Sequence, residues 1–144
     1  MQHREFISQL DEQRIVRAIG DVEKTTSGEI RVCLSRKERH DALAFAQKRF
    51  RQLGMFKTRH RNAILIYIVP RTRQFAVLGD VGIHQKCGEE FWKQIARGMS
   101  AKMKERKFTE AIVEAIQTAG RALQQHFPAT RSDTNELSDA IARD

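Results

Sequence analysis

The side chains of this sequence best suited to acid–base chemistry are two carboxylates and an imidazole, those of Glu29, Asp80 and His84. Glu29 follows Gly28 and begins a stretch of alternating apolar residues, whereas Asp80 and His84 come shortly after an apolar stretch that ends at Gly79. A carboxylate can activate water as a general base, and an imidazole can protonate a leaving group. These three residues are therefore the first candidates for a catalytic site.

Arg61 and Asn62 precede another apolar stretch and offer groups that could hold an anionic substrate. A phosphatase without a covalent nucleophile needs a metal or an arginine clamp to neutralise the phosphate, and Arg61 would be that clamp. Substrate contacts would come from the neighbouring polar and glycine residues, Gly28, Lys57, Arg59, Asn62 and Gly79. Alternatively, Arg61 forms a structural ion pair with Asp80 or Glu29, which would occupy the same groups.

Three apolar stretches predict the strands that position these residues. Residues 29–35 alternate apolar and polar side chains, and residues 63–69 are continuously apolar. Residues 75–79 are a short apolar stretch that is expected to form an antiparallel hairpin with residues 63–69. An amphipathic helix capped by Asp41 and ended by Gly54 connects the first two strands, which are therefore expected to be parallel. The starts of these two strands then meet the end of the third, so the candidate residues share one edge of the sheet.

The remaining apolar residues recur at helical spacing. One amphipathic helix is predicted within residues 8–26, with Ser8 and Asp11 as its cap, and helical core stripes run through residues 87–103 and 108–123. From Pro128 onward the pattern becomes polar. We therefore predict a single α/β domain over residues 1–128, an α/β/α sandwich with a small mixed β-sheet flanked by helices on both faces, and a polar tail over residues 129–144.

Positive charge is concentrated in one part of the chain. The protein has 144 residues and a net charge of +8, and the segment from Arg36 to Arg73 contains 11 Lys and Arg against two acids, a local charge of +9. Such a segment is often only a solvated face, but it could also bind an acidic protein, an anionic membrane surface or nucleic acid. The basic side chains would come from one helix and one loop, Lys48, Arg49, Arg51, Lys57, Arg59 and Arg61.

Several classes of protein find no support in the sequence. There is no apolar run of about 18 residues and no signal-peptide pattern at the start, so we expect a cytoplasmic protein that associates with membranes only at their surface. His84 and Cys87 lack the further ligands of a zinc site, and no nucleophile elbow or glycine-rich phosphate loop occurs. Phe45 and Phe50 fit a buried stripe, which leaves nucleic acid as the third-ranked partner.

Five segments occur along the chain in the order TTSGEIRV, LGMFKTRHRNAILIYI, RQFAVLGDVGI, the FW pair at residues 91–92 and FPATRSDTNEL. Together they resemble the TPM-domain family, named after a thylakoid lumen protein, and in particular its short bacterial branch without a signal peptide. The resemblance extends from about Asp11 to Asp139 and implies an α/β/α sandwich. It also implies a choice of roles: a plant relative is described as an acid phosphatase, an animal relative as a receptor accessory protein, and some bacterial relatives as calcium-binding.

Three positions depart from the family pattern, since His60 replaces an aspartate, Ala63 a glycine and Ser138 a proline. Calcium prefers several carboxylate ligands, and only Glu29 and Asp80 would remain to supply them. We therefore expect no cofactor and only weak calcium binding. The most favoured function is an accessory binding domain for a protein or an anionic membrane surface. The alternative is a metal-assisted acid phosphatase, and the third is weak nucleic-acid binding.

Overall fold

A computed structural model of the chain describes residues 1–130 and 137–144. Residues 131–136, which belong to the segment FPATRSDTNEL, lie outside this description. The described residues form helices and strands with the bounds α1 (His3–Ser8), α2 (Glu12–Glu23), β1 (Glu29–Leu34), α3 (Ala42–Gln52), β2 (Ala63–Val69), β3 (Gln74–Gly79), α4 (Val81–Cys87), α5 (Glu89–Lys104), α6 (Phe108–His126) and β4 (Ala142–Arg143), with short 3₁₀ helices η1 (Met55–Lys57) and η2 (Pro70–Thr72).

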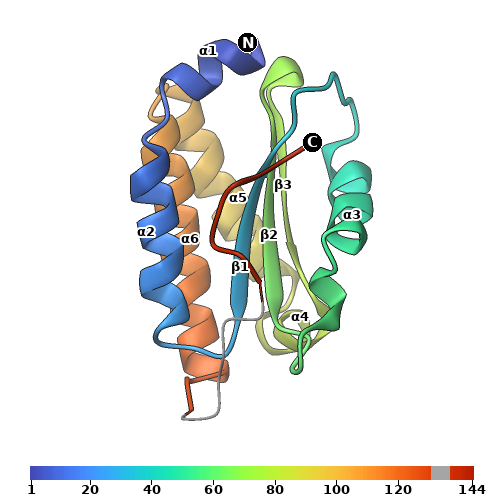
Figure 1. The fold of residues 1–144 in the computed structure, drawn as a ribbon, viewed down its shortest axis with the longest axis vertical. Coiled ribbons are helices and arrows are strands. Elements are labelled where there is room, and N and C mark those ends of the chain that lie inside the picture. Colours follow the sequence, from blue (N-terminus) through green and yellow to red (C-terminus); the bar gives the residue numbers. More distant parts are fainter. Residues whose placement is uncertain (131–136) are drawn as a thin grey trace.

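The strands form one mixed sheet in the order β3-β2-β1-β4. β1 and β2 are parallel, with Glu29 opposite Ala63 and Leu34 opposite Ile68, which confirms that the helix between them is a crossover. β2 and β3 form the predicted antiparallel hairpin, and β4 adds to the other side of β1 in parallel. Helices α2, α5 and α6 cover one face of the sheet and α3 covers the other, so the predicted sandwich is confirmed (Figure 1).

Each face of the sheet has its own apolar core. Every residue of β2 is buried, as its continuous apolar sequence predicts, because its side chains alternate between the two cores. Ile30, Ile64 and Ile66 pack toward α2, α5 and α6, while Leu65 and Tyr67 pack toward α3. The largest part of the core lies on the three-helix side, where α6 alone buries eleven residues.

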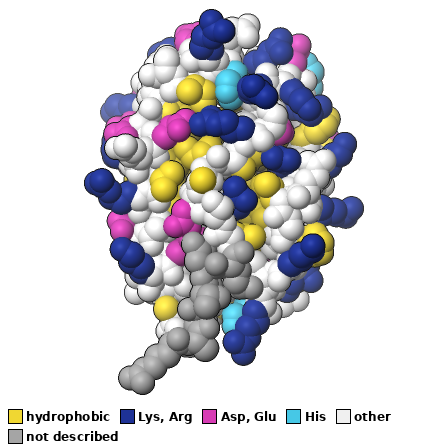
Figure 2. Space-filling model, in the orientation of Figure 1, with side chains coloured by type: hydrophobic (Ala, Val, Ile, Leu, Met, Phe, Trp, Pro, Cys, Tyr) yellow, Lys and Arg dark blue, Asp and Glu magenta, His cyan; other side chains and the backbone are white. Residues whose placement is uncertain are grey.

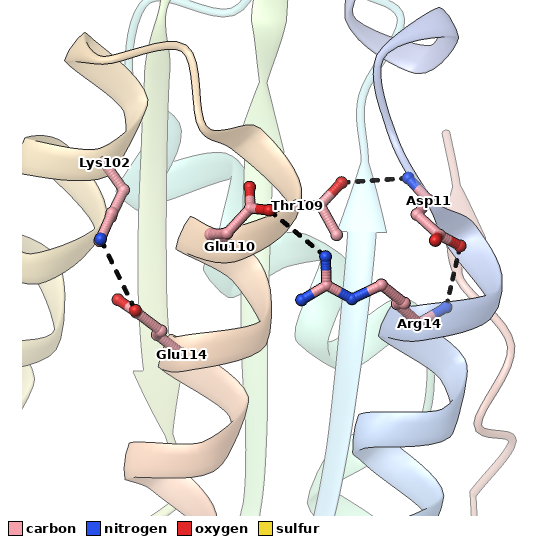
Figure 3. A network of polar contacts seen from close by, with 6 residues as sticks. All are labelled: Asp11, Arg14, Lys102, Thr109, Glu110 and Glu114. Atoms are coloured by element: carbon pink, nitrogen blue, oxygen red, sulfur yellow. Dashed lines mark hydrogen bonds and ion pairs between the residues drawn. The ribbon is translucent and has the colours of Figure 1, made fainter.

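Polar contacts join the three helices on that side (Figure 3). The Asp11 amide donates to Thr109 Oγ1 at 3.0 Å, and Arg14 forms a salt bridge with Glu110 at 3.3 Å, both between α2 or its cap and α6. Lys102 of α5 lies 3.8 Å from Glu114 of α6. The salt-bridged side chains are partly exposed to solvent, so we expect these ion pairs to orient the helices more than to stabilise them.

Three details differ from the sequence predictions. Ser8 ends α1, where its hydroxyl donates to the Glu5 carbonyl, and Asp11 alone caps α2 by accepting from the Arg14 amide at 3.2 Å. The helix expected over residues 87–103 is interrupted at Gly88, whose φ of 77° ends α4 and allows α5 to start in a new direction. Within the segment expected to be a polar tail, residues 142–143 form β4, a strand too short to show alternation.

No helix in the described part of the chain combines the length and the apolar character that crossing a membrane would require.

Candidate functional site

The structure places the candidate residues at one end of the sheet, the lower end in Figure 1. Glu29 begins β1 opposite Ala63, and the Asp80 amide donates to the Ala63 carbonyl at 2.9 Å. Asn62 directly precedes Ala63, so Glu29, Asn62 and Asp80 lie on three neighbouring strand ends. We call this group, together with Arg61 and His84, the rim. Its side chains share a location, but they point to different partners.

Arg61 and Asp80 form the ion pair that the sequence left as an alternative. Arg61 Nε lies 2.7 Å from Asp80 Oδ2, and Nη2 lies 2.9 Å from Oδ1, a two-pronged arrangement that is strong because both groups are charged. This contact raises the pKa of the Arg61 guanidinium. Asp80 is also buried and accepts from the Val81 amide at 2.7 Å, so it caps α4. Both carboxylate oxygens of Asp80 are therefore occupied within the fold.

Asn62, Gly28 and Gly79 also serve the packing of this end. Asn62 is fully buried, and its Nδ2 donates to Ser27 Oγ at 3.2 Å, which ties β2 to the connection before β1. A Cβ atom at Gly28 would collide with the side chain of Leu123, and one at Gly79 would collide with the indole of Trp92. The two glycines therefore make room for neighbouring side chains, which accounts for both of them without a substrate.

His84, Lys57 and Arg59 are exposed, unlike the buried members of the rim. His84 is exposed on α4, and its Nδ1 accepts from Trp92 Nε1 at 2.9 Å, so the imidazole is oriented by α5. Lys57 and Arg59 are exposed in the loop before β2, where the Lys57 ammonium lies 5.7 Å from the centre of the Phe56 ring. The general acid and the general base proposed from the sequence thus have separate surroundings.

Glu29 belongs to a group of carboxyls that the sequence did not predict. The pKa of Glu23, at the end of α2, is raised well above its ordinary value, first by burial and then by hydrogen bonds with the carboxyls of Asp139 and Glu29. Glu23 Oε2 also accepts from the Ile30 amide at 3.0 Å, which joins the end of α2 to the start of β1. No motif marks Glu23, because its role depends on where α2 ends relative to the sheet.

Glu29 and Asp80, the two carboxylates named as possible calcium ligands, already have partners within the fold. Calcium prefers six to eight hard oxygen ligands, including ionised carboxylates. The two Asp80 oxygens face Arg61 and the Val81 amide, and Glu29 shares hydrogen bonds with Glu23, whose raised pKa keeps a proton among these carboxyls. Among the described residues, no group of three or more His, Cys, Asp or Glu side chains is placed to hold a metal ion.

Beside the rim lies an open hollow of about 590 Å³ between α3, the loop after it and the start of α4. We call it the α3 hollow. Glu29 and His84, both described residues, do not line the α3 hollow. Phe56 and Val81 lie on its wall and are 39% and 51% exposed. The lining consists of Gln47, Phe50, Arg51, Phe56, Arg61, Leu78, Gly79, Asp80 and Val81.

The basic surface expected on α3 consists of fewer residues than the sequence indicates. Lys48 and Arg51 are exposed, but Arg49 is half-buried and its Nη2 donates to the Arg143 carbonyl at 2.9 Å. Arg49 therefore helps to hold β4 in place and is not part of a free basic face. Lys and Arg side chains nevertheless line the right-hand side of the molecule, where α3 lies, with apolar side chains between them (Figure 2).

Comparison with known proteins identifies the fold independently. The family model described as the TPM domain matches residues 1–122. Among solved structures, the chain is similar to the NMR structure of the BA42 protein from the psychrophilic bacterium Bizionia argentinensis, with 35% sequence identity, a TM-score of 0.85 and 92% of each chain covered. No curated protein matches the chain.

Proposed function

The chain belongs to the TPM-domain family, and from that premise we propose that it is an accessory binding module whose α3 hollow recognises an acidic, partly apolar segment of a partner protein. The observation that carries this proposal is the exposure of two large apolar side chains in one hollow. Leu43, Phe56 and Val81 are the large apolar residues that are exposed in the described part of the chain, and the last two line the α3 hollow. Exposed apolar side chains that cluster often mark an interaction site.

Charge favours an acidic partner. Arg51 lies on the wall of the α3 hollow and Lys48 is exposed on the same helix, and neither forms a salt bridge with a described residue. Arg61 is neutralised by Asp80, so Arg51 is the arginine of the hollow that is available to a partner. Carboxylates flanking an apolar side chain would therefore complement this surface.

The shape of the site favours a protein segment over a membrane. A hollow of about 590 Å³ can receive one or two side chains of a partner protein. A bilayer presents a broad surface, which would contact only the outer edge of the α3 hollow. A catalytic role is less favoured, because Asp80 would have to release Arg61 before it could accept a proton from water.

The proposal can be tested by fluorescence anisotropy with a labelled peptide of about 12 residues that carries Asp and Glu around a central Leu. We expect Phe56→Ser and Arg51→Glu each to weaken binding by about 10-fold or more, since aromatic and arginine anchors carry most of the affinity at interfaces. Replacing the central Leu by Gly should have a similar effect. The matched control is Arg17→Glu, because Arg17 is exposed on α2, on the opposite side of the sheet.

The same variants separate the alternatives. Binding to vesicles of anionic lipid that depends on Phe56 and Arg51, with no binding of the peptide, would replace the proposal by membrane recognition. Turnover of a phosphate ester that is abolished by Asp80→Asn would replace it by catalysis. Asn is as good an N-cap as Asp, so Asp80→Asn should preserve α4. Under our proposal this variant retains peptide binding.

A further inference from the structure

A second hollow lies at the opposite end of the sheet from the rim. Its volume is about 740 Å³, and four arginines from four separate segments line it. Arg4 comes from α1, Arg36 from the connection after β1, Arg71 from η2 and Arg143 from β4. We call it the arginine hollow. It includes no residue of the rim or of the α3 hollow, and its arginines are separated by more than 30 residues along the chain.

Salt bridges with acids involve only two of the four arginines of the arginine hollow among the described residues. Arg143 forms a salt bridge with Glu12, and Arg71 lies 3.8 Å from Glu38, a long and exposed contact. Arg4 and Arg36 form no salt bridge with any residue in the described ranges 1–130 and 137–144. Two of the four guanidinium groups are therefore available to an anionic ligand.

The backbone around these arginines is well anchored. The Ser35 amide donates to the Ile68 carbonyl at 2.9 Å, and the Arg36 amide donates to the Asp144 carbonyl at 3.4 Å. His3 also lines the arginine hollow. Its Nδ1 lies 3.3 Å from the Ser35 carbonyl oxygen, and this contact fixes the start of α1 over the end of β1. A scaffold held in this way limits the reorganisation that ligand binding would require.

The position in the sheet also points to ligand binding. β1, β2 and β4 are parallel, and the arginine hollow lies outside their carboxyl ends. In open α/β sheets, ligands bind in crevices at this end of the strands. In Figure 1 this is the upper end, where α1 and both termini lie.

We propose that the arginine hollow binds a small ligand with two or more clustered phosphate groups. Guanidinium groups form two parallel hydrogen bonds with phosphate oxygens, and arginines from several directions can surround a phosphate group. The volume of about 740 Å³ lies within the range of roughly 300–1,000 Å³ that is typical of small-molecule sites. The ligand is either a soluble phosphorylated compound or the phosphorylated headgroup of a lipid, which present the same chemistry.

Isothermal titration calorimetry with inorganic pyrophosphate tests the site directly. We expect pyrophosphate to bind more tightly than inorganic phosphate, and the double variant Arg4→Gln/Arg36→Gln to bind it about 10-fold or more weakly, because two charge-assisted contacts are lost. The matched control is Arg17→Gln/Arg121→Gln, which removes the same charge from exposed positions on α2 and α6. Circular dichroism should show that both double variants fold.

Three results would overturn the proposal. The first is no binding of pyrophosphate at millimolar concentration by the folded native protein. The second is an equal loss of affinity in the control variant, which would show that pyrophosphate responds only to net charge. In NMR spectra, the Nε–H signals of Arg4 and Arg36 should shift on titration, whereas that of Arg17 should not. Unchanged signals of Arg4 and Arg36 at saturation would also contradict the site.

Vesicles distinguish the two sources of phosphate. Phosphatidylcholine vesicles with a few per cent of a phosphoinositide should displace pyrophosphate if the ligand is a lipid headgroup, and phosphatidylserine vesicles of equal charge should not. If neither kind of vesicle displaces pyrophosphate, the ligand is a soluble phosphorylated compound. Both outcomes retain the arginine hollow as a phosphate site, because each requires Arg4 and Arg36.

Discussion

The two ends of the sheet use charged side chains in opposite ways. At the rim, Asp80 is held by Arg61, and Glu29 shares hydrogen bonds with Glu23, so the charged groups bind one another. At the arginine hollow, Arg4 and Arg36 have no acidic partner among the described residues. The difference shows that a cluster of unlike polar residues at strand ends can be structural, and the arginines without an acidic partner are the basis of the phosphate site that we propose.

The connections at the two ends explain this difference. At the rim, Asp80 alone separates β3 from α4, and the chain before β2 passes so close to α4 that the Gly82 amide donates to the Arg61 carbonyl at 2.8 Å. Tight connections bury backbone and side-chain polar groups, which must then find partners inside the protein. At the other end, residues 35–41 form a longer connection whose charged side chains are exposed, except for Arg39, which is half-buried over the Phe45 ring.

The largest expected effect comes from filling the space at the rim. Gly82→Ala would place a Cβ atom against the carbonyl oxygens of His60 and Arg61, which are backbone atoms and cannot move as a flexible side chain can. We expect the free energy of unfolding to fall by about 3 kcal/mol or more, at the upper end of what overpacking costs. Urea denaturation measures this loss, and pyrophosphate binding at the opposite end should persist in the fraction that remains folded.

Gly98→Ala is the matched control for this substitution. Gly98 lies within α5, and no atom lies within 4 Å of the position that a Cβ would occupy. Alanine is favoured over glycine inside a helix, so this variant should gain about 0.5–1 kcal/mol. Equal effects of the two substitutions would show that the close approach of α4 to the chain before β2 is not a constraint.

The second prediction uses pH to separate the two ends. The pKa of Glu23 is raised from its ordinary value of 4.5, so the folded state binds a proton that the unfolded state releases near that pH. The contribution of Glu23 is therefore complete below pH 4.5 and is lost as pH rises toward the raised pKa, with a slope of at most about 1.4 kcal/mol per pH unit. Glu23→Gln should remove this slope in urea denaturation between pH 5 and 9.

Asp21→Asn provides the comparison for Glu23→Gln, because Asp21 is an exposed acid of the same helix. We expect its pH profile to parallel that of the native protein. If Glu23→Gln and the native protein also show parallel profiles, the three carboxyls do not share a proton and the account of the rim is wrong.

Local patterns in the sequence predicted most of the fold. Alternation in residues 29–35, the continuous apolar run in residues 63–69 and the short link at residues 70–74 predicted two parallel strands and a hairpin, because burial and chain length leave few arrangements. The break at Gly88 was missed, since the apolar spacing continues across it. β4 was also missed, because a strand of two residues has no periodicity.

The candidate site was harder to predict than the fold. The position of Glu29, Asn62 and Asp80 at one end followed from the strand directions, but the partner of each side chain depends on rotamers and on where neighbouring elements end. Arg61 illustrates this point, since its role depends on a left-handed backbone, with φ of 52°, that turns its side chain toward Asp80. The arginine hollow was not predicted, because its residues come from distant segments of the chain.

The smallest expected effect concerns the frame of the arginine hollow. The hydroxyl of Tyr67, a residue that is 1% exposed, donates to Asp144 Oδ2 at 2.7 Å. The main chain of Asp144 is in turn hydrogen-bonded to Leu34 and Arg36. Tyr67→Phe removes this hydrogen bond and keeps the ring, so the free energy of unfolding should fall by about 1 kcal/mol. Hydrogen exchange of the Asp144 amide, which donates to the Leu34 carbonyl, should become faster.

The pH dependence of this effect should differ from that at Glu23. Burial raises the pKa of Tyr67 from 10 to about 12, so its proton is bound in both states below pH 10, and stability is lost only as pH rises from about 10 to about 12. The difference between the native protein and Tyr67→Phe should therefore stay constant from pH 5 to 9, where the effect of Glu23→Gln changes. A Tyr67→Phe difference that varies over this range would mean that the tyrosine contact is coupled to a group that titrates there, and the contrast between the two ends would fail.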